Sequence, residues 1–158
     1  MIALLKSWKK FSDGPRDVEP QPPQPTARPK RTVLVIDDDP TMVRALHLAL
    51  YEAGFDVVTS TSGLKGINAV RFSPRVIDVV LLDYMMPGFD GGKTLPYLRE
   101  LASGAKIVCT TGLEAKHLPK ELREGVDEVI QKPFAFDALV AALNALLSTE
   151  AASKSGTR

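Results

Sequence analysis

The sequence predicts an α/β fold in which a parallel sheet is covered by helices on both faces. Short apolar runs with strand character alternate with segments whose apolar residues recur at helical spacing, which is the order of elements in parallel α/β sheets. The run from Val76 to Leu82 is almost unbroken in apolar character, as expected for a central strand buried on both faces. Acidic residues directly follow the first and third of these apolar runs. Functional polar side chains are therefore expected where the strands end.

The folded part is expected to be one domain of about residues 32–148. Six of the seventeen residues from 14 to 30 are proline, so residues 14–31 are interpreted as a Pro-rich linker. Residues 1–13 are interpreted as a possible short amphipathic helix, because Leu4, Trp8 and Phe11 follow helical spacing. Two alternatives stay open for it: a frayed terminus, or a helix that docks on a partner or a membrane surface. Residues 149–158 are expected to form a flexible tail.

Five strands and five helices are expected to alternate along the domain. The predicted strands are Thr32–Ile36, Phe55–Thr59, Val76–Leu82, Lys106–Thr110 and Glu128–Ile130. The first helix should follow Asp39, which suits the N-cap, with Pro40 in its first turn and Gly54 after its end. A short second helix is expected over Ser62–Arg71.

The later helices contain prolines that constrain where they begin. Pro96 costs about 3 kcal/mol inside a helix, so Thr94 rather than Asp90 is the preferred N-cap of the third helix. Pro119 should start a short fourth helix that ends at Gly125. The last helix is expected over Phe136–Leu147. Its predicted buried stripe consists of Phe136, Leu139, Val140, Leu143, Leu146 and Leu147.

Right-handed crossovers between parallel strands limit the possible topologies. Analogy with other doubly wound sheets favours the flavodoxin-like (βα)5 arrangement with strand order 2-1-3-4-5. In such sheets ligands bind beyond the carboxyl ends of the strands. Strands 1 and 3 would then lie side by side, and the residues that follow all the strands would meet at one edge.

The residues at that edge have the chemistry of phosphoryl transfer to a carboxylate. Asp37 and Asp38 follow the first strand, Asp83 follows the third, and Thr111 and Lys132 follow the fourth and fifth. Clustered carboxylates are costly without a cation, and hard oxygen ligands favour Mg²⁺. An aspartate can act as a nucleophile and form an acyl phosphate, while a lysine supplies a positive charge for the phosphoryl group.

Four segments resemble the strand-end motifs of the receiver domains of two-component response regulators. They are VLVIDDDP, VVLLDYMMPGFDG, IVCTTG and VIQKPF, and together they span the predicted domain in register. The resemblance implies that Asp83 is the phospho-acceptor. It further implies a Mg²⁺ ion bound directly by Asp38, partly through water by Asp37, and also by Asp83 and the backbone carbonyl of Met85.

The resemblance also assigns roles at the fourth and fifth strands. Thr111 corresponds to the switch hydroxyl, and Lys132 to the lysine that pairs with the phosphoryl group. Pro133 follows Lys132, and in this family that peptide bond is commonly cis. The chain departs from the family at Val129, where many receivers carry an aromatic ring that moves inward on activation. The usual aromatic readout is therefore not expected here.

The expected function is that of a response regulator without an output domain, phosphorylated by a sensor histidine kinase or a histidine phosphotransfer protein. It would signal to an unidentified protein target, with a possible homodimer through the fourth and fifth helices. It would not be an enzyme beyond catalysing its own phosphorylation and slow dephosphorylation. Alternatives are a phosphorelay intermediate or phosphate sink, and a pseudo-receiver that is never phosphorylated. A metal-dependent hydrolase is disfavoured, because the predicted strand-end loops are too short for a lid.

Composition excludes several other classes. Residues 32–158 carry thirteen basic against sixteen acidic side chains, which disfavours nucleic-acid binding. No apolar run is long enough for a transmembrane segment and no signal peptide is apparent, so a cytoplasmic location is expected. A single cysteine, Cys109, excludes an internal disulfide and is interpreted as a buried small hydrophobe.

Overall fold

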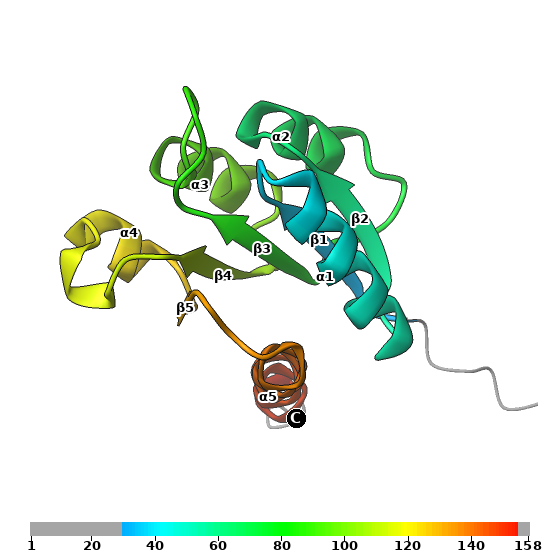
Figure 1. Cartoon of the computed structure of the whole chain (residues 1–158). Coiled ribbons are helices and arrows are strands. Elements are labelled where there is room, and N and C mark those ends of the chain that lie inside the picture. Colours follow the sequence, from blue (N-terminus) through cyan, green and yellow to red (C-terminus); the bar gives the residue numbers. More distant parts are fainter. Residues whose placement is uncertain (1–29, 155–158) are drawn as a thin grey trace, which may run out of the picture.

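The computed structural model describes residues 30–154 and contains one five-stranded parallel sheet flanked by helices (Figure 1). The strands are β1 (Thr32–Ile36), β2 (Asp56–Ser60), β3 (Val79–Asp83), β4 (Lys106–Thr111) and β5 (Glu128–Gln131). The helices are α1 (Pro40–Glu52), α2 (Gly63–Phe72), α3 (Gly91–Leu101), α4 (Lys120–Gly125) and α5 (Phe136–Lys154), with a 3-10 turn, η2, over Ala115–His117. The order β2-β1-β3-β4-β5 confirms the predicted topology. The predictions for residues 1–29 and 155–158 lie outside the described residues.

Two hydrophobic clusters lie on opposite faces of the sheet. One joins side chains of β1, β3 and β4 to α3 and α4, with partly buried residues of α2 against it. The other joins the alternate side chains of the same strands to α1 and α5. Because the side chains of a strand alternate between faces, β1 and β3 are buried along their whole length. This burial explains why their sequences are continuously apolar. No helix within residues 30–154 is long and apolar enough to cross a bilayer.

The third strand starts later than the sequence predicted. It was expected from Val76, but β3 begins at Val79 and includes Asp83. The Val76 side chain is 81% exposed. The backbone turns into the sheet only at Asp78, whose carboxylate accepts the backbone N–H of Thr32 at 2.7 Å. The apolar run was therefore a poor guide to the strand boundary.

The predicted N-cap of the third helix is wrong. The carboxylate of Asp90 accepts the backbone N–H of Lys93 at 2.9 Å, and α3 starts at Gly91. The Thr94 hydroxyl donates to the Asp90 carbonyl at 2.8 Å, so Thr94 lies inside the helix. Pro96 is consequently an interior residue that removes one helical hydrogen bond. The other predicted caps are confirmed: Asp39 caps α1, and Pro119 precedes α4.

The last helix begins at Phe136 as predicted but ends later than predicted. It continues to Lys154, so the residues 149–154 of the expected flexible tail are helical. Leu139, Leu143 and Leu147 are buried as predicted. Phe136 is 37% exposed and so does not belong to the buried stripe. The ring of Phe136 instead lies edge-on to Phe134, with 6.3 Å between their centroids.

A charged network ties the start of β4 to the turn before β5. The Asp127 carboxylate accepts hydrogen bonds from Arg99 Nη2 at 2.8 Å, Lys106 Nζ at 3.1 Å and the backbone N–H of Ile107 at 2.8 Å. Partial burial alone would raise the pKa of Asp127, but these hydrogen bonds outweigh it and the pKa lies below its usual value. The carboxylate is therefore stabilised in its charged form.

Candidate functional site

Strand register brings two buried carboxylates together at the carboxyl edge of the sheet. Ile36 of β1 pairs with Leu82 of β3, so the residues that follow, Asp37 and Asp83, lie next to each other. Both are buried, at 2% and 4% exposed. The adjacency of β1 and β3, which the order 2-1-3-4-5 requires, thus positions the candidate phospho-acceptor beside a second acid.

Asp38 completes an acidic cluster with Asp37 and Asp83. One carboxylate oxygen from each lies within 4.8 Å of the others. Asp38 is exposed while the other two are buried, so the cluster opens toward solvent on the Asp38 side. Asp39 has a different role, because its carboxylate accepts the backbone N–H of Thr41 and caps α1. The sequence interpretation of Asp39 as a cap is confirmed.

Lys132, which directly follows β5, bridges the two buried carboxylates. Its Nζ donates to Asp37 Oδ2 at 2.7 Å and to Asp83 Oδ1 at 2.9 Å. The Lys132–Pro133 peptide bond is cis, as expected. Burial alone would lower the pKa of Lys132, but its two carboxylate partners outweigh burial and raise the pKa. For Asp83 burial dominates and raises the pKa, although Lys132 acts in the opposite direction.

The donor set fits a divalent cation. Three carboxylates and one ammonium carry a formal charge of −2, since Lys132 neutralises only one of the three acids. Oxygen ligands with an open, solvated side are those that Mg²⁺ prefers. The residues that would hold the ion are Asp37, Asp38 and Asp83. The predicted fourth ligand, the carbonyl of Met85, belongs to the loop that follows β3.

Thr111 ends β4 with its side chain completely buried. Its hydroxyl accepts the backbone N–H of Leu113 at 3.0 Å, so it is held within the connection between β4 and α4. Val129, which stands where many receivers carry an aromatic ring, is partly buried against the same hydrophobic cluster as Leu113. The structure thus places a small aliphatic side chain, already packed, at this position of β5.

Sequence reasoning gave no role to Gly91, which lies against the acceptor strand. A Cβ at this position would come within 2.7 Å of the Asp83 carbonyl oxygen and 2.9 Å of Tyr84 Cα. Both are backbone atoms, which cannot rotate away as a side chain can. Only glycine therefore allows α3 to begin this close to Asp83. In the sequence, the only indication of this role was that Gly91 directly follows Asp90, a residue type that caps helices.

This fold, with an acidic cluster and a lysine at the carboxyl edge of a 2-1-3-4-5 sheet, is that of a receiver domain. A family model for the response regulator receiver domain matches residues 33–144. The chain therefore belongs to the response regulator receiver family, and the predicted family is confirmed.

Several transcriptional regulators are similar to this chain. It is 34% identical over 113 residues to the transcriptional regulatory protein KdpE of Mycobacterium tuberculosis, covering 72% of the chain and 49% of KdpE. It is 33% identical over 119 residues to the DNA-binding response regulator MtrA of Mycolicibacterium smegmatis, covering 75% of the chain and 51% of MtrA. The chain thus spans about half the length of these curated relatives.

Solved structures of receiver domains have the same fold. A response regulator receiver domain protein from Clostridium thermocellum superposes with a TM-score of 0.69 at 26% identity, covering 76% of this chain and 96% of that one. A CheY-like receiver domain protein from Methanospirillum hungatei gives a TM-score of 0.71 at 21% identity, covering 78% and 98% of the two chains. These domains correspond to most of the described residues.

Proposed function

We propose that this domain accepts a phosphoryl group from a phosphohistidine onto Asp83 and signals through contacts that depend on that modification. The observation that carries the proposal is Lys132, which bridges Asp37 and Asp83 while the cluster still has an excess negative charge. A site with this charge suits a divalent cation together with an incoming phosphoryl group. The donor would be a sensor histidine kinase or a histidine phosphotransfer protein.

The reaction is an in-line displacement at phosphorus. A carboxylate oxygen of Asp83 forms the new P–O bond as the P–N bond to the donor imidazole breaks, and the imidazole leaves with the electron pair and takes up a proton. Lys132 would exchange its contact with Asp83 for one with a phosphoryl oxygen. Thr111 would release the Leu113 N–H and donate its hydroxyl proton to another phosphoryl oxygen.

A bound Mg²⁺ would supply electrostatic stabilisation of the charge that develops on the phosphoryl oxygens. Asp37 and Asp38 would hold the ion, with Asp83 and the backbone carbonyl of Met85 as further ligands. Apart from its own phosphorylation and slow dephosphorylation the domain would catalyse no reaction.

Intact-mass measurement after incubation with acetyl phosphate and Mg²⁺ tests the proposal. We expect a gain of one phosphoryl group, lost in EDTA and in Asp83→Asn. Asp39→Asn is the matched control: it also removes an acid from this loop, but asparagine is an equally good N-cap, so the variant should still be phosphorylated. Absence of the adduct in folded wild-type protein under every condition would favour the pseudo-receiver alternative.

The phosphorelay and phosphate-sink alternatives differ in what happens after phosphorylation. A relay intermediate would pass the group from Asp83 to a histidine phosphotransfer protein, and a sink would lose it to water. Mixing phosphorylated domain with such a protein and following both masses distinguishes these outcomes from a lasting switch. In a lasting switch the group would stay on Asp83 while a protein target is bound.

If phosphorylation is signalled through dimerisation, the dimer would form through the surface of α4 and α5. Phe136 and the many alanines of α5 give this helix an outer face with little charge, which is compatible with a protein contact. Light scattering before and after phosphorylation tests this, with Asp83→Asn as the control. A phosphorylation-dependent doubling of mass would support dimerisation, and an unchanged mass would direct the search to other protein targets.

A further inference from the structure

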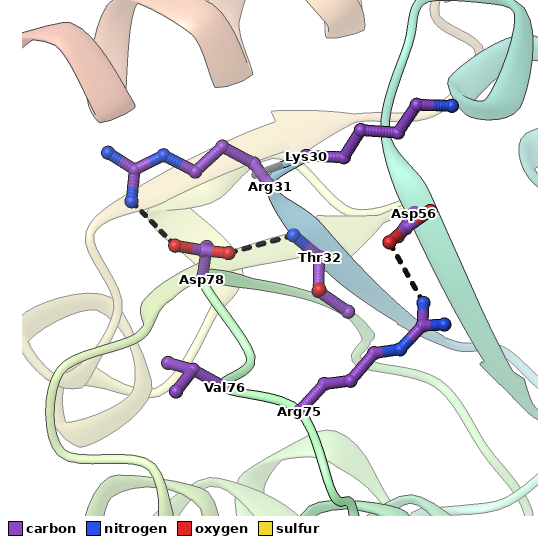
Figure 2. A pocket seen from close by; sticks show the side chains of 7 residues that line it. All are labelled: Lys30, Arg31, Thr32, Asp56, Arg75, Val76 and Asp78. Atoms are coloured by element: carbon purple, nitrogen blue, oxygen red, sulfur yellow. Dashed lines mark hydrogen bonds and ion pairs between the residues drawn. The ribbon is translucent and has the colours of Figure 1, made fainter. Parts of the chain in front are cut away.

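The amino edge of the sheet, opposite the acidic cluster, carries an elongated open depression. Lys30, Arg75 and Val76 line a first part of about 810 Å³ (Figure 2). A second part of about 430 Å³ continues from it along the end of α3, over Leu101–Ala105. The two parts share Arg31, Arg75, Val76 and Asp78. We refer to this continuous surface as the amino-edge groove.

Apolar side chains at this groove are unusually exposed. Val76 is 81% exposed, the highest value among the large hydrophobic side chains of residues 30–148. Leu101 at the end of α3 is also exposed, at 40%. Removing such surface from water is favourable in proportion to its area. A surface of this kind marks an interaction site.

Both acids at the groove are paired with arginines, while the ammonium of Lys30 lies over the ring of Tyr51. Arg31 Nη1 lies 2.6 Å from Asp78, and Arg75 Nη1 lies 2.8 Å from Asp56. Figure 2 shows both ion pairs beside Val76. The groove therefore combines acids that are neutralised with exposed apolar side chains. This composition suits an apolar ligand segment more than a strongly charged one.

We propose that the segment 1–13 of the same chain docks in the amino-edge groove. The chain reaches the domain at Lys30, which itself lines the groove, so the residues before it start at the proposed binding surface. The segment supplies Leu4, Trp8 and Phe11 at helical spacing, which would form one apolar face for the exposed side chains of the groove.

The length of the linker permits this contact. Residues 14–29 reach roughly 50 Å when extended as polyproline II, whereas a domain of this size has a radius of gyration of about 14 Å. Because the segment is tethered to the domain, docking is an intramolecular step whose occupancy does not depend on protein concentration. Because the groove lies at the edge opposite Asp83, docking does not require phosphorylation, and its failure would leave the proposed function untouched.

The single tryptophan of the chain, Trp8, reports docking directly. In the full-length protein we expect its emission at shorter wavelength than in a peptide of residues 1–13. Val76→Ser and Leu101→Ser, both in the groove, should each shift the emission to longer wavelength. Leu48→Ser is the matched control, because Leu48 is 55% exposed on α1, away from the groove, and it should leave the emission unchanged. Asp83→Asn should also leave it unchanged.

A proximity measurement tests the same contact without altering apolar side chains. Cys109 is buried, and burial raises the pKa of its thiol to about 12, so a cysteine introduced at the surface can be labelled selectively. A nitroxide on Ser103→Cys, in the groove, should quench Trp8. The same label on Glu114→Cys, in the connection that follows β4 at the opposite edge, should not.

Four results would overturn the proposal. Quenching that grows with protein concentration would mean that the segment binds a second copy. Emission that moves to shorter wavelength only when anionic vesicles are added would mean a membrane contact. An emission equal to that of the peptide, or a response to Leu48→Ser but not to Val76→Ser, would also contradict docking in this groove. Persistence of the groove-dependent signal at low concentration would support docking within one chain.

Discussion

Replacing Lys132 by methionine tests the electrostatics of the site most directly. Lys132 is the common partner of Asp37 and Asp83, whose side chains are 3% and 6% exposed. Methionine keeps the length and the apolar stem of the side chain but removes the charge. In Lys132→Met two buried carboxylates would face each other without the ammonium that bridges them, so the folded state should be destabilised.

The size of the effect follows from the burial of the three groups. Removing one partner of a buried ion pair costs about 3–5 kcal/mol. The Lys132 side chain is 22% exposed, and water reaches the cluster on the Asp38 side, so we expect the lower end, about 3 kcal/mol, in EDTA. With an m-value of about 2 kcal/mol/M this lowers the urea midpoint by about 1.5 M.

Urea unfolding followed by far-UV circular dichroism measures this, because that signal reports the helices and the sheet of the domain. Mg²⁺ should raise the midpoint of Lys132→Met more than that of the wild type, because the ion replaces part of the lost charge. Adding Asp83→Asn to Lys132→Met should recover at least about 1 kcal/mol through coupling of neighbouring groups. Lys120→Met, which removes a lysine that is 71% exposed, should change stability by under about 0.5 kcal/mol. A wild-type midpoint for Lys132→Met in EDTA would refute the reasoning.

Three further predictions concern other parts of the domain. Gly91→Ala should lower the free energy of unfolding by about 1–3 kcal/mol through overpacking and slow phosphorylation by acetyl phosphate, because the new Cβ meets the Asp83 carbonyl. Urea unfolding and mass-detected phosphorylation measure these effects. Gly104→Ala, whose Cβ would have no atom within 4 Å, is the control for both. Asp127→Asn should cost about 2 kcal/mol at neutral pH. The pKa of Asp127 is lowered in the folded state. This stabilisation is therefore complete above the unfolded pKa of about 4 and is lost as pH falls through the folded pKa. The urea midpoints of wild type and variant should converge at that low pH, and a constant difference down to about pH 2 would contradict the prediction. Cys109, with a thiol pKa of about 12 caused by burial, should resist a thiol-specific disulfide reagent at pH 8 in folded protein and react on unfolding.

The fold was predictable because its core strands are buried on both faces. Burial makes β1 and β3 continuous apolar runs, and their order follows from the handedness of crossovers and analogy with other doubly wound sheets. Boundaries were less predictable, since an apolar residue such as Val76 satisfies the strand pattern while its side chain is exposed. Phe136 was placed in the core for the same reason. Its position on α5 fits the buried stripe, but it lies at the first residue of the helix.

Local hydrogen bonding explains the error at α3. Asp90 and Thr94 are both good N-caps, and the penalty for an interior proline favoured Thr94. In the structure the Asp90 carboxylate, its carbonyl and the Thr94 hydroxyl together satisfy the first turn. The hydrogen bonds gained in the first turn outweigh the one lost at Pro96. A propensity assigned to one residue at a time cannot represent several hydrogen bonds acting together.

The residues of the acidic cluster were predictable, but their electrostatic state depends on geometry. The register of β1 and β3 forces Asp37 and Asp83 together, so the same packing that stabilises the sheet brings two buried acids into contact. Lys132 offsets one charge, and burial still raises the pKa of Asp83. The folded state therefore carries an unfavourable interaction that a cation or a phosphoryl group with its ion can relieve. This unfavourable interaction lies at the edge where we propose that the phosphoryl group is accepted, and such local conflicts are typical of functional sites.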